Sequence, residues 1–179
     1  VGSGVGVAAT QIARAIGAIS IGTSRTADKL KEASKLGLDH SILVEDGKFA
    51  ERVKELTASN GVALVLELVG GSYFEEDLDC VRYQGRIMIV GLLAGRKVEC
   101  DLGKILSKRI NVRGTTLRTR PLEQKILAGQ MLARNIVPLL KKGLLKPLVD
   151  REFNLEEADK AHTYMESNEN FGKIVLKVS

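Results

Sequence analysis

The chain has 179 residues, of which 44% are hydrophobic and 27% are charged, and its formal net charge is +5 at pH 7. This composition predicts one ordinary domain, or one domain with an appendage, and it excludes a disordered or low-complexity chain. No apolar run approaches the roughly 18 residues of a membrane span, and dispersed basic residues with 4% aromatics leave RNA binding only a weak alternative.

The two cysteines, Cys80 and Cys100, have no CxxC partner and no histidine at a metal-ligand spacing. This pattern predicts free thiols, no metal site and a reducing compartment, which we expect to be the cytoplasm. His40 and His162 are single histidines, and we expect solvated or capping roles for them rather than catalysis.

The chain begins with a glycine-rich turn that runs directly into a helix, VGSGVGVAATQIARAIG. Apolar residues recur at spacings of three and four from Val5 to Ile16, which predicts one inward apolar stripe, and Gly17 ends the helix. A turn of this kind normally follows a buried strand, and no strand precedes Val1 in this sequence. We therefore expect the first strand of the sheet to be missing from it.

Strands and helices then alternate along the chain. The predicted elements are a strand over 18–24, a helix over 26–36, a strand over 41–44, a helix over 48–56, an apolar strand over 62–71 buried on both faces, a helix over 73–83, and strands over 86–91 and 110–116. This alternation is typical of βαβ units, and it predicts an α/β fold with a Rossmann-type doubly wound parallel sheet.

The alternation changes at Pro121. The residues beyond it predict a long helix up to about Lys142 that Pro138 kinks or divides, then a strand, a helix opened by a capping box, and a final strand. We therefore predict a Rossmann-type domain over 1–121, incomplete at its N-terminus, and a C-terminal segment over 122–179.

The opening turn has the composition of a phosphate-binding loop. Backbone amides there can approach a diphosphate without Cβ clashes, and the positive end of the following helix favours an anion. The candidate residues are Ser3, Gly4, Val5 and Gly6. The glycines alternate rather than follow G-x-G-x-x-G, so a plain tight turn is the alternative. A strand ending about 20 residues later, where a dinucleotide's ribose is bound, favours the phosphate site.

That second strand ends with Ser24 and Arg25, and Lys29 follows one helical turn later. NAD enzymes place a carboxylate here for the ribose 2′-hydroxyl, whereas a hydroxyl and two cations suit a 2′-phosphate. The sequence therefore predicts NADPH as the cofactor, with a solvated basic helix end as the alternative.

Several segments together resemble a known family: SGVGVAATQIARAIGA, GTSRTADKL, ELVGGSYFEEDL, GRIMIVGLLAG, RGTTLRTR and NLEEADKAHTYMESNENFGKIVLKV. They are similar to the quinone oxidoreductase branch of the zinc-independent medium-chain dehydrogenase/reductase superfamily. The resemblance implies reduction of quinones or α,β-unsaturated carbonyl compounds with NADPH and without zinc. It also implies a preceding GroES-like catalytic domain, toward which residues 122–179 pack, and no activity for this segment alone.

The resemblance also implies cofactor contacts further along the chain. They are Gly70 and Gly71 after the central strand, Gly91 and Leu92 beside the nicotinamide ribose, Leu117 and Arg118 near the carboxamide, and Asn170 and Gly172 in a late loop. One position departs from the family pattern, because relatives often carry a tyrosine near the 2′-phosphate where this chain has Val44. No catalytic residue is identified.

Two other functions stay open at this point. An enoyl-thioester reductase of fatty acid or polyketide synthesis uses the same cofactor domain, and an NADPH-binding module without catalysis would carry the same loop. The resemblance further implies a small-molecule quinone or enone substrate, no membrane or nucleic-acid partner, and a homodimer paired through the outer strand near 110–116.

Overall fold

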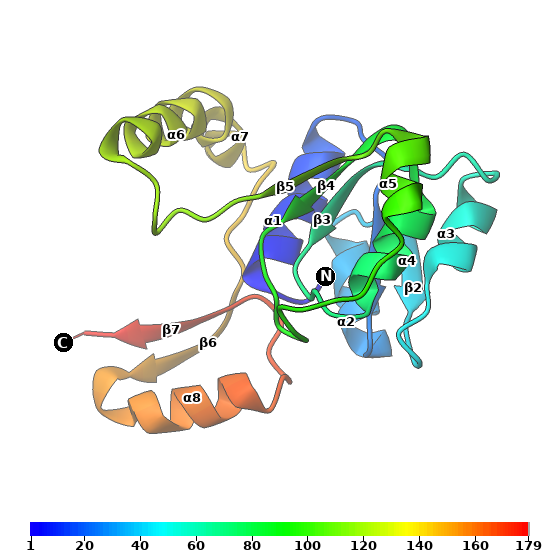
Figure 1. Ribbon diagram of the computed structural model, residues 1–179. Coiled ribbons are helices and arrows are strands. Elements are labelled where there is room, and N and C mark those ends of the chain that lie inside the picture. The colour runs from blue at the N-terminus through cyan, green and yellow to red at the C-terminus, as the bar shows by residue number, and fades with distance from the viewer. Residues whose placement is uncertain (179) are drawn as a thin grey trace. The chain divides into compact units, whose positions relative to one another are not determined.

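The computed structural model describes residues 1–178, in which helices and strands alternate (Figure 1). In chain order the elements are α1 (Gly4–Ala15), β1 (Ile21–Ser24), α2 (Ala27–Lys35), β2 (His40–Leu43), α3 (Ala50–Leu56), β3 (Val62–Glu67), α4 (Tyr73–Cys80), β4 (Val81–Ile89), α5 (Leu102–Lys108), β5 (Asn111–Gly114), α6 (Leu122–Asn135), α7 (Val137–Lys141), β6 (Val149–Asn154), η1 (Leu155–Glu157), α8 (Ala158–Glu166) and β7 (Lys173–Lys177). Each predicted helix and strand is present, with ends shifted by a few residues.

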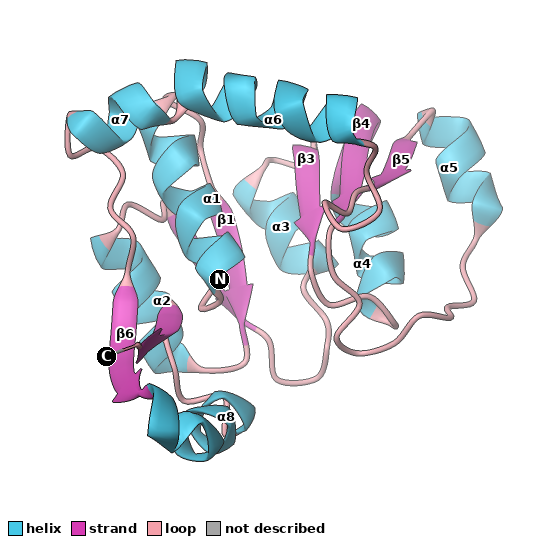
Figure 2. Cartoon of the chain, turned by 90° about the vertical axis from the view of Figure 1, so that its left-hand side faces the viewer, coloured by secondary structure: helices cyan, strands magenta, loops and turns pink. Residues whose placement is uncertain are grey.

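The strands form three sheets, and each described strand pair is parallel. β1 pairs with β2, β4 lies between β3 and β5, and β6 pairs with β7, with helices connecting the paired strands (Figure 2). Parallel neighbours require such crossover connections, usually helical. The predicted α/β class with parallel strands is therefore confirmed.

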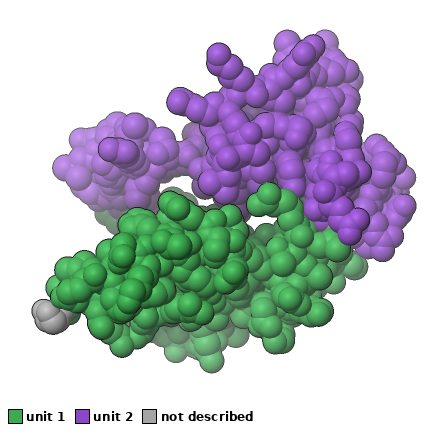
Figure 3. Space-filling model, turned by 90° about the horizontal axis from the view of Figure 1, so that it is seen from below, with its two compact units in different colours: residues 1–43, 129–179 green, residues 44–128 purple. Residues whose placement is uncertain are grey.

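The chain folds into two compact units (Figure 3). Unit 1 contains residues 1–43 and the chain from residue 129 onward, and unit 2 contains residues 44–128. Unit 1 carries the β1–β2 and β6–β7 sheets, and unit 2 carries the β3–β4–β5 sheet. The units differ from the predicted domains, 1–121 and 122–179, which stay a prediction.

The core of unit 2 lies between α4 and the β3–β4–β5 sheet. Leu78 of α4 and Ile87 of β4 are fully buried, and they pack with Phe74, Val81 and Ile110. Phe74 and Leu78 are four residues apart, so they share one face of α4. This packing fixes the start of α4, and with it the turn that connects β3 to α4.

The core of unit 1 brings the two ends of the chain together. Leu30 and Ala33, on the inner face of α2, are buried with Leu38, and Val1 and Phe171 pack against this group. The contact with Phe171 places the loop before β7 beside the first residues of the chain.

The buried face of α1 differs from the predicted apolar stripe. Val5 and Ile16 are 41% and 69% exposed. The buried residues are instead Gly6, Val7, Thr10 and Gln11. Gln11 explains the difference, because its Nε2 donates to the carbonyl of Lys146 at 3.0 Å and its Oε1 accepts the Lys146 amide at 2.9 Å. A polar side chain tolerates burial when such bonds are made.

The prediction of a strand over 62–71 that is buried on both faces is wrong. β3 ends at Glu67, and Val65 packs against the unit 2 core. Leu64 and Leu66 lie on the other face and are 52% and 37% exposed. Because successive side chains of a strand alternate between faces, burial reaches only one face of β3.

The predicted division of the long helix at Pro138 is confirmed. α6 ends at Asn135 and α7 begins at Val137, with Pro138 in its first turn, where a missing amide hydrogen costs little. The capping box is also present, since Asn154 and Glu157 bond reciprocally at the start of η1. Within the part of the chain that the structure describes, no helix combines the length and apolarity of a membrane span.

Gln11→Ala is expected to lower the free energy of unfolding by about 1–3 kcal/mol, because two backbone groups of Lys146 lose their partners. Urea unfolding of the purified protein measures this change. Gln130→Ala is the control: Gln130 is exposed on α6, and its replacement should change the stability by less than about 0.5 kcal/mol. Equal effects of the two substitutions would contradict the role given to Gln11.

Candidate functional site

One candidate region, in unit 1, is the turn that starts α1. Ser3 caps the helix: its Oγ accepts the amide of Gly6 at 3.1 Å, and its carbonyl accepts the amide of Val7 at 2.9 Å. The amides of Gly4 and Val5 stand in the first turn, where a helix offers no internal acceptor. The four predicted residues, Ser3 to Gly6, thus form one helix start that presents free N–H groups.

Gly6 stands where the helix approaches the preceding backbone most closely. A Cβ atom at Gly6 would fall far inside contact distance of the Val1 carbonyl oxygen, and within 2.8 Å of the Val1 Cα. A backbone neighbour cannot move aside as the end of a flexible side chain can. Gly6 therefore occupies the close-packing position that the sequence assigns to the last glycine of the loop.

Two lysine side chains lie over this turn. The Cδ of Lys29 is 2.6 Å from the position of a Cβ at Gly2, and the Nζ of Lys173 is 2.9 Å from the position of a Cβ at Gly4. Both lysines therefore use space that glycine leaves open. Lys173 was not predicted as a site residue; the only sequence signal is its place directly after Gly172 in the late loop.

The late loop lies directly beside the opening turn. The amide of Gly172 donates to the carbonyl of Gly2 at 2.9 Å, and Ser3 and Gly172 form a parallel β-bridge. Asn170 is half-buried two residues earlier. The structure thus brings the predicted late loop to the predicted phosphate loop, although about 170 residues separate them.

The end of β1 forms a pocket with another part of the late chain. Its lining residues are Arg25, Thr26, Asp28, Lys29, Ser167, Asn168 and Glu169. Lys29 donates from Nζ to the Asn168 carbonyl, and the Oγ of Ser24 accepts the Thr26 amide at 3.1 Å. Partial burial, and then the charge of Arg25, lower the pKa of Lys29. An anion bound between Arg25 and Lys29 would oppose both effects.

A separate candidate region lies in unit 2, where two loops follow β3 and β4. Gly70 and Gly71 adopt positive φ angles of 70° and 57°. The Ala94 amide donates to the Val69 carbonyl at 2.7 Å, and Gly70 forms a parallel bridge with Gly95. A Cβ at Gly91 would lie 2.6 Å from the Leu68 carbonyl oxygen, and a Cβ at Gly70 would lie 2.8 Å from the Leu92 side chain. Gly70, Gly71, Gly91 and Leu92 therefore form one glycine-rich surface.

Glu67, the last residue of β3, arranges these loops, and sequence reasoning missed it. Its side chain accepts the amides of Val69 and, at 2.7 Å, of Gly70. Its carbonyl accepts the amides of Val90 at 2.8 Å and Gly91 at 3.2 Å. One residue thus holds amides of both loops.

Leu117 and Arg118 lie in the segment between β5 and α6. Leu117 is 64% exposed, and the carbonyl of Arg118 accepts the Nζ of Lys125 at 3.4 Å. In residues 1–178 neither residue makes a hydrogen bond to the loops after β3 and β4. Their predicted place beside the nicotinamide stays a prediction. The same stretch of the structure contains no group of three or more His, Cys, Asp or Glu residues placed to hold a metal ion.

Comparison with known proteins gives consistent matches. Residues 4–132 match the zinc-binding dehydrogenase family. The chain is 35% identical over 173 residues to a 2-haloacrylate reductase of Burkholderia sp, an alignment that covers 92% of this chain and 49% of that protein. It is 32% identical over 179 residues to quinone oxidoreductase 1 of Escherichia coli (strain K12), covering 97% of this chain and 53% of that protein.

A solved structure agrees with these relatives. The crystal structure of Escherichia coli quinone oxidoreductase complexed with NADPH matches the fold with a TM-score of 0.85 at 29% sequence identity. The match covers 99% of this chain and 55% of that one. The chain therefore spans about half the length of the curated relatives it matches.

Gly6→Ala is expected to lower the free energy of unfolding by about 1–3 kcal/mol, because the new methyl group must displace backbone at Val1. Gly129→Ala is the matched control. Gly129 lies inside α6, and no atom stands within 4 Å of its Cβ position, so this change should raise the stability by about 0.5–1 kcal/mol. Urea unfolding of both variants tests the opposite signs; the same sign at both positions would overturn the close approach at Gly6.

Proposed function

The chain belongs to the zinc-binding dehydrogenase family, on its quinone oxidoreductase branch, and we propose that it forms the cofactor-binding part of an NADPH-dependent oxidoreductase. Its substrates are quinones or other α,β-unsaturated carbonyl compounds. The observation that carries this proposal is the convergence of Lys29 and Lys173 on the glycine turn at the start of α1. Cations beside the positive end of a helix are unfavourable until an anion binds between them.

The diphosphate of the cofactor is assigned to the turn at the start of α1. The Gly4 and Val5 amides donate to the phosphate oxygens, and Gly6 keeps the helix close to the chain before it. Lys173 adds a charge that a phosphate group compensates. Lys173 is exposed, so Lys173→Ala should weaken diphosphate binding without changing the conformation of the turn.

The 2′-phosphate is assigned to the pocket at the end of β1. Arg25 and Lys29 supply two cations, and the one carboxylate of α2 that lines the pocket, Asp28, is paired with Lys31 at 3.1 Å. Val44 is buried and offers no hydroxyl group, which lowers the expected preference relative to family members that carry a tyrosine.

The nicotinamide half is assigned to Gly70, Gly71, Gly91, Leu92, Leu117 and Arg118. The bound nicotinamide supplies the hydride, and the contribution of the protein is to hold the ring near the acceptor carbon and to exclude water. We assign no zinc to this reaction, on the strength of the sequence resemblance. No catalytic residue is assigned within this chain, and we expect this segment alone to be inactive.

An assay of the intact protein with NADPH tests the function. The substrate panel contains quinones, enones and enoyl thioesters, and NADPH oxidation is followed at saturating cofactor. Turnover of quinones or enones supports the proposal. Turnover of enoyl thioesters alone indicates the alternative reductase, and NADPH binding without any turnover indicates a binding module.

NADPH should bind more tightly than NADH by about tenfold to a hundredfold, or about 1.4–2.8 kcal/mol. The reason is the charge-assisted hydrogen bonds that Arg25 and Lys29 make to the 2′-phosphate. Arg25→Ala with Lys29→Ala should remove most of this difference by weakening NADPH binding more than NADH binding. High salt should reduce the difference in the wild type.

The control is Lys35→Ala with Lys160→Ala, which removes two unit 1 cations paired with Glu32 and Glu157. This variant has the same net charge as the test variant and should keep the preference. Titration of NADPH and NADH against the wild type, the test variant and the control variant measures the preference in each protein. Equal wild-type affinities, or a test variant that loses both cofactors alike, would show that Arg25 and Lys29 do not recognise the phosphate.

The intact protein is further proposed to be a cytoplasmic homodimer that pairs through β5. This strand is one of the two outer strands of its sheet and is exposed along its length, including Val112. An exposed strand edge invites pairing with a second copy. Val112→Lys should therefore shift sedimentation toward monomer, whereas Leu106→Lys, on exposed α5, should not. A wild type that sediments only as monomer at micromolar concentration would refute the dimer.

A further inference from the structure

Two buried carboxyl groups meet behind the loop that follows β3. Asp77 lies in α4 and is 2% exposed, and Glu67 ends β3 and is 4% exposed. Acidic side chains are rarely buried to this degree without a positive partner. The Asp77 side chain lies within reach of a hydrogen bond to the Glu67 carboxyl group. Because a carboxylate can only accept, that bond requires a proton on one of the two groups.

The contacts of the pair place this proton on Asp77. Glu67 already uses its side chain to accept the amides of Val69 and Gly70, so it is the acceptor of the pair. Asp77 has no such support: in residues 1–178, its buried Oδ2 has no hydrogen-bond donor beside it. Burial, and then the hydrogen bond and charge of Glu67 and the charge of Glu76, raise the pKa of Asp77 to about 10.

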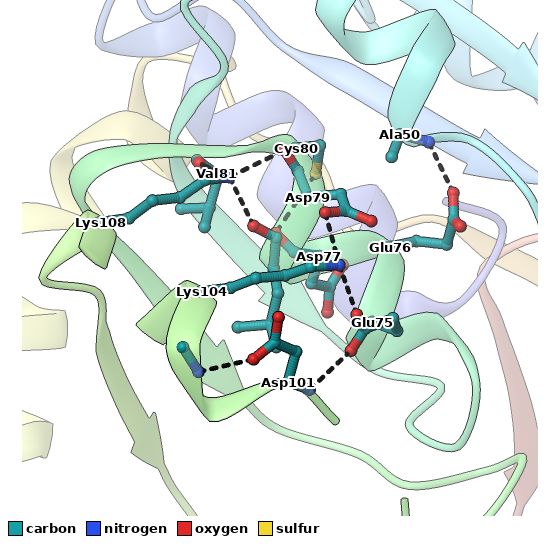
Figure 4. Close-up of polar contacts among 12 residues, drawn as sticks. Ala50, Glu75, Glu76, Asp77, Asp79, Cys80, Val81, Asp101, Lys104 and Lys108 are labelled. Carbon is teal, nitrogen blue, oxygen red and sulfur yellow. Dashed lines mark hydrogen bonds and ion pairs between the residues drawn. The ribbon is translucent and has the colours of Figure 1, made fainter. Parts of the chain in front are cut away.

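The three lysines that lie around α4 have partners other than Asp77. Figure 4 shows Lys104 between Glu75 and Asp79, and Lys108 pointing at backbone carbonyl groups behind α4. Lys48 pairs with Glu76 at 3.0 Å.

The other titratable neighbours do not supply a positive charge. Glu76 is on the same helix; burial opposes its charge, but the amides of Ala50 and Phe49 outweigh this and lower its pKa. The thiol of Cys80 is neutral, because burial and then the neighbouring Asp77 raise its pKa to about 12. Protonation is thus the remaining way to neutralise Asp77.

We propose that Asp77 is a protonated positioning residue, which donates a hydrogen bond to the carboxylate of Glu67 and thereby fixes that carboxylate against the amides of Val69 and Gly70. The positive φ angles of Gly70 and Gly71 are held by this carboxylate. The inference rests on the proposed function only where it assigns this turn to the cofactor; the proton itself is a property of the fold.

Asp77→Asn keeps the size of the side chain and a donor for Glu67, whereas Asp77→Ala removes the donor. In the intact protein, Asp77→Ala should accelerate hydrogen exchange at the Val69 and Gly70 amides about tenfold and weaken NADPH binding by a similar factor. Asp77→Asn should restore both to within about threefold of the wild type. A purely structural role for Asp77 would slow or speed exchange throughout α4 and would not single out these two amides.

The pH dependence of stability tests the proton separately. An aspartate in the unfolded chain ionises near pH 4, whereas the folded protein keeps this proton up to about pH 10. The stabilisation is therefore complete below pH 4 and is lost as the pH rises toward 10. Relative to Asp77→Asn, the unfolding constant of the wild type should rise by up to about tenfold per pH unit between pH 5 and 9.

Each outcome decides a different question. A ratio of unfolding constants that stays flat between pH 5 and 9 would show that Asp77 is ionised in the folded protein and would overturn the proposal. Equal damage by Asp77→Asn and Asp77→Ala would overturn it too. If Asp77→Ala does not fold, the comparison of wild type with Asp77→Asn still tests whether Asp77 is protonated in the folded protein. If the wild type binds no NADPH, the cofactor assignment fails, while hydrogen exchange and the pH series still test the acid pair.

Discussion

The positive potential at the start of α1 is the constraint on which the cofactor proposal depends. The helix end contributes free amide hydrogens, and Lys29 and Lys173 reach the same turn across the space left by Gly2 and Gly4. A fold selected for stability alone has no reason to gather like charges at the positive end of a helix. Lys29 already shows the cost, since burial and Arg25 lower its pKa. A polyanionic ligand removes this cost, and a dinucleotide phosphate has the required charge.

In unit 2, a negatively charged type of side chain, the carboxyl group of Glu67, holds a glycine turn. The loop after β3 contains two glycines with positive φ angles, Gly70 and Gly71, and so has few side chains to hold the turn. Glu67 supplies the missing restraint from behind, because one carboxylate accepts two amides of the turn. The turn is therefore shaped by a buried acceptor and not by side chains on its ligand-facing surface. Under the proposed function, a residue with no contact to the ligand would control its binding through this turn.

The sequence predicted the order and type of elements because each depends on local patterns. Alternating apolar runs, Gly17 and Pro138 act within one or two helical turns, and the capping box at Asn154 spans only four residues. The buried face of α1 was not predictable in this way, since it depends on Gln11 meeting the backbone of Lys146, 135 residues later. Lys173 and Glu67 were missed for the same reason: neither belongs to a recognisable motif, and each gains its role from contacts that only the folded chain provides.

The acid pair also explains why an aspartic acid at position 77 is tolerable in the core. Ionisation of both Asp77 and Glu67 would bury two like charges side by side, at a cost that no nearby cation could offset. Lys48, Lys104 and Lys108 each have other partners, and drawing one inward would break an ion pair or leave helix carbonyls without donors. Keeping Asp77 protonated at neutral pH costs free energy, because an aspartate in the unfolded chain would be ionised. In return, the proton converts a repulsive contact with Glu67 into a hydrogen bond. Glu67 then stays the acceptor for the amides of the turn.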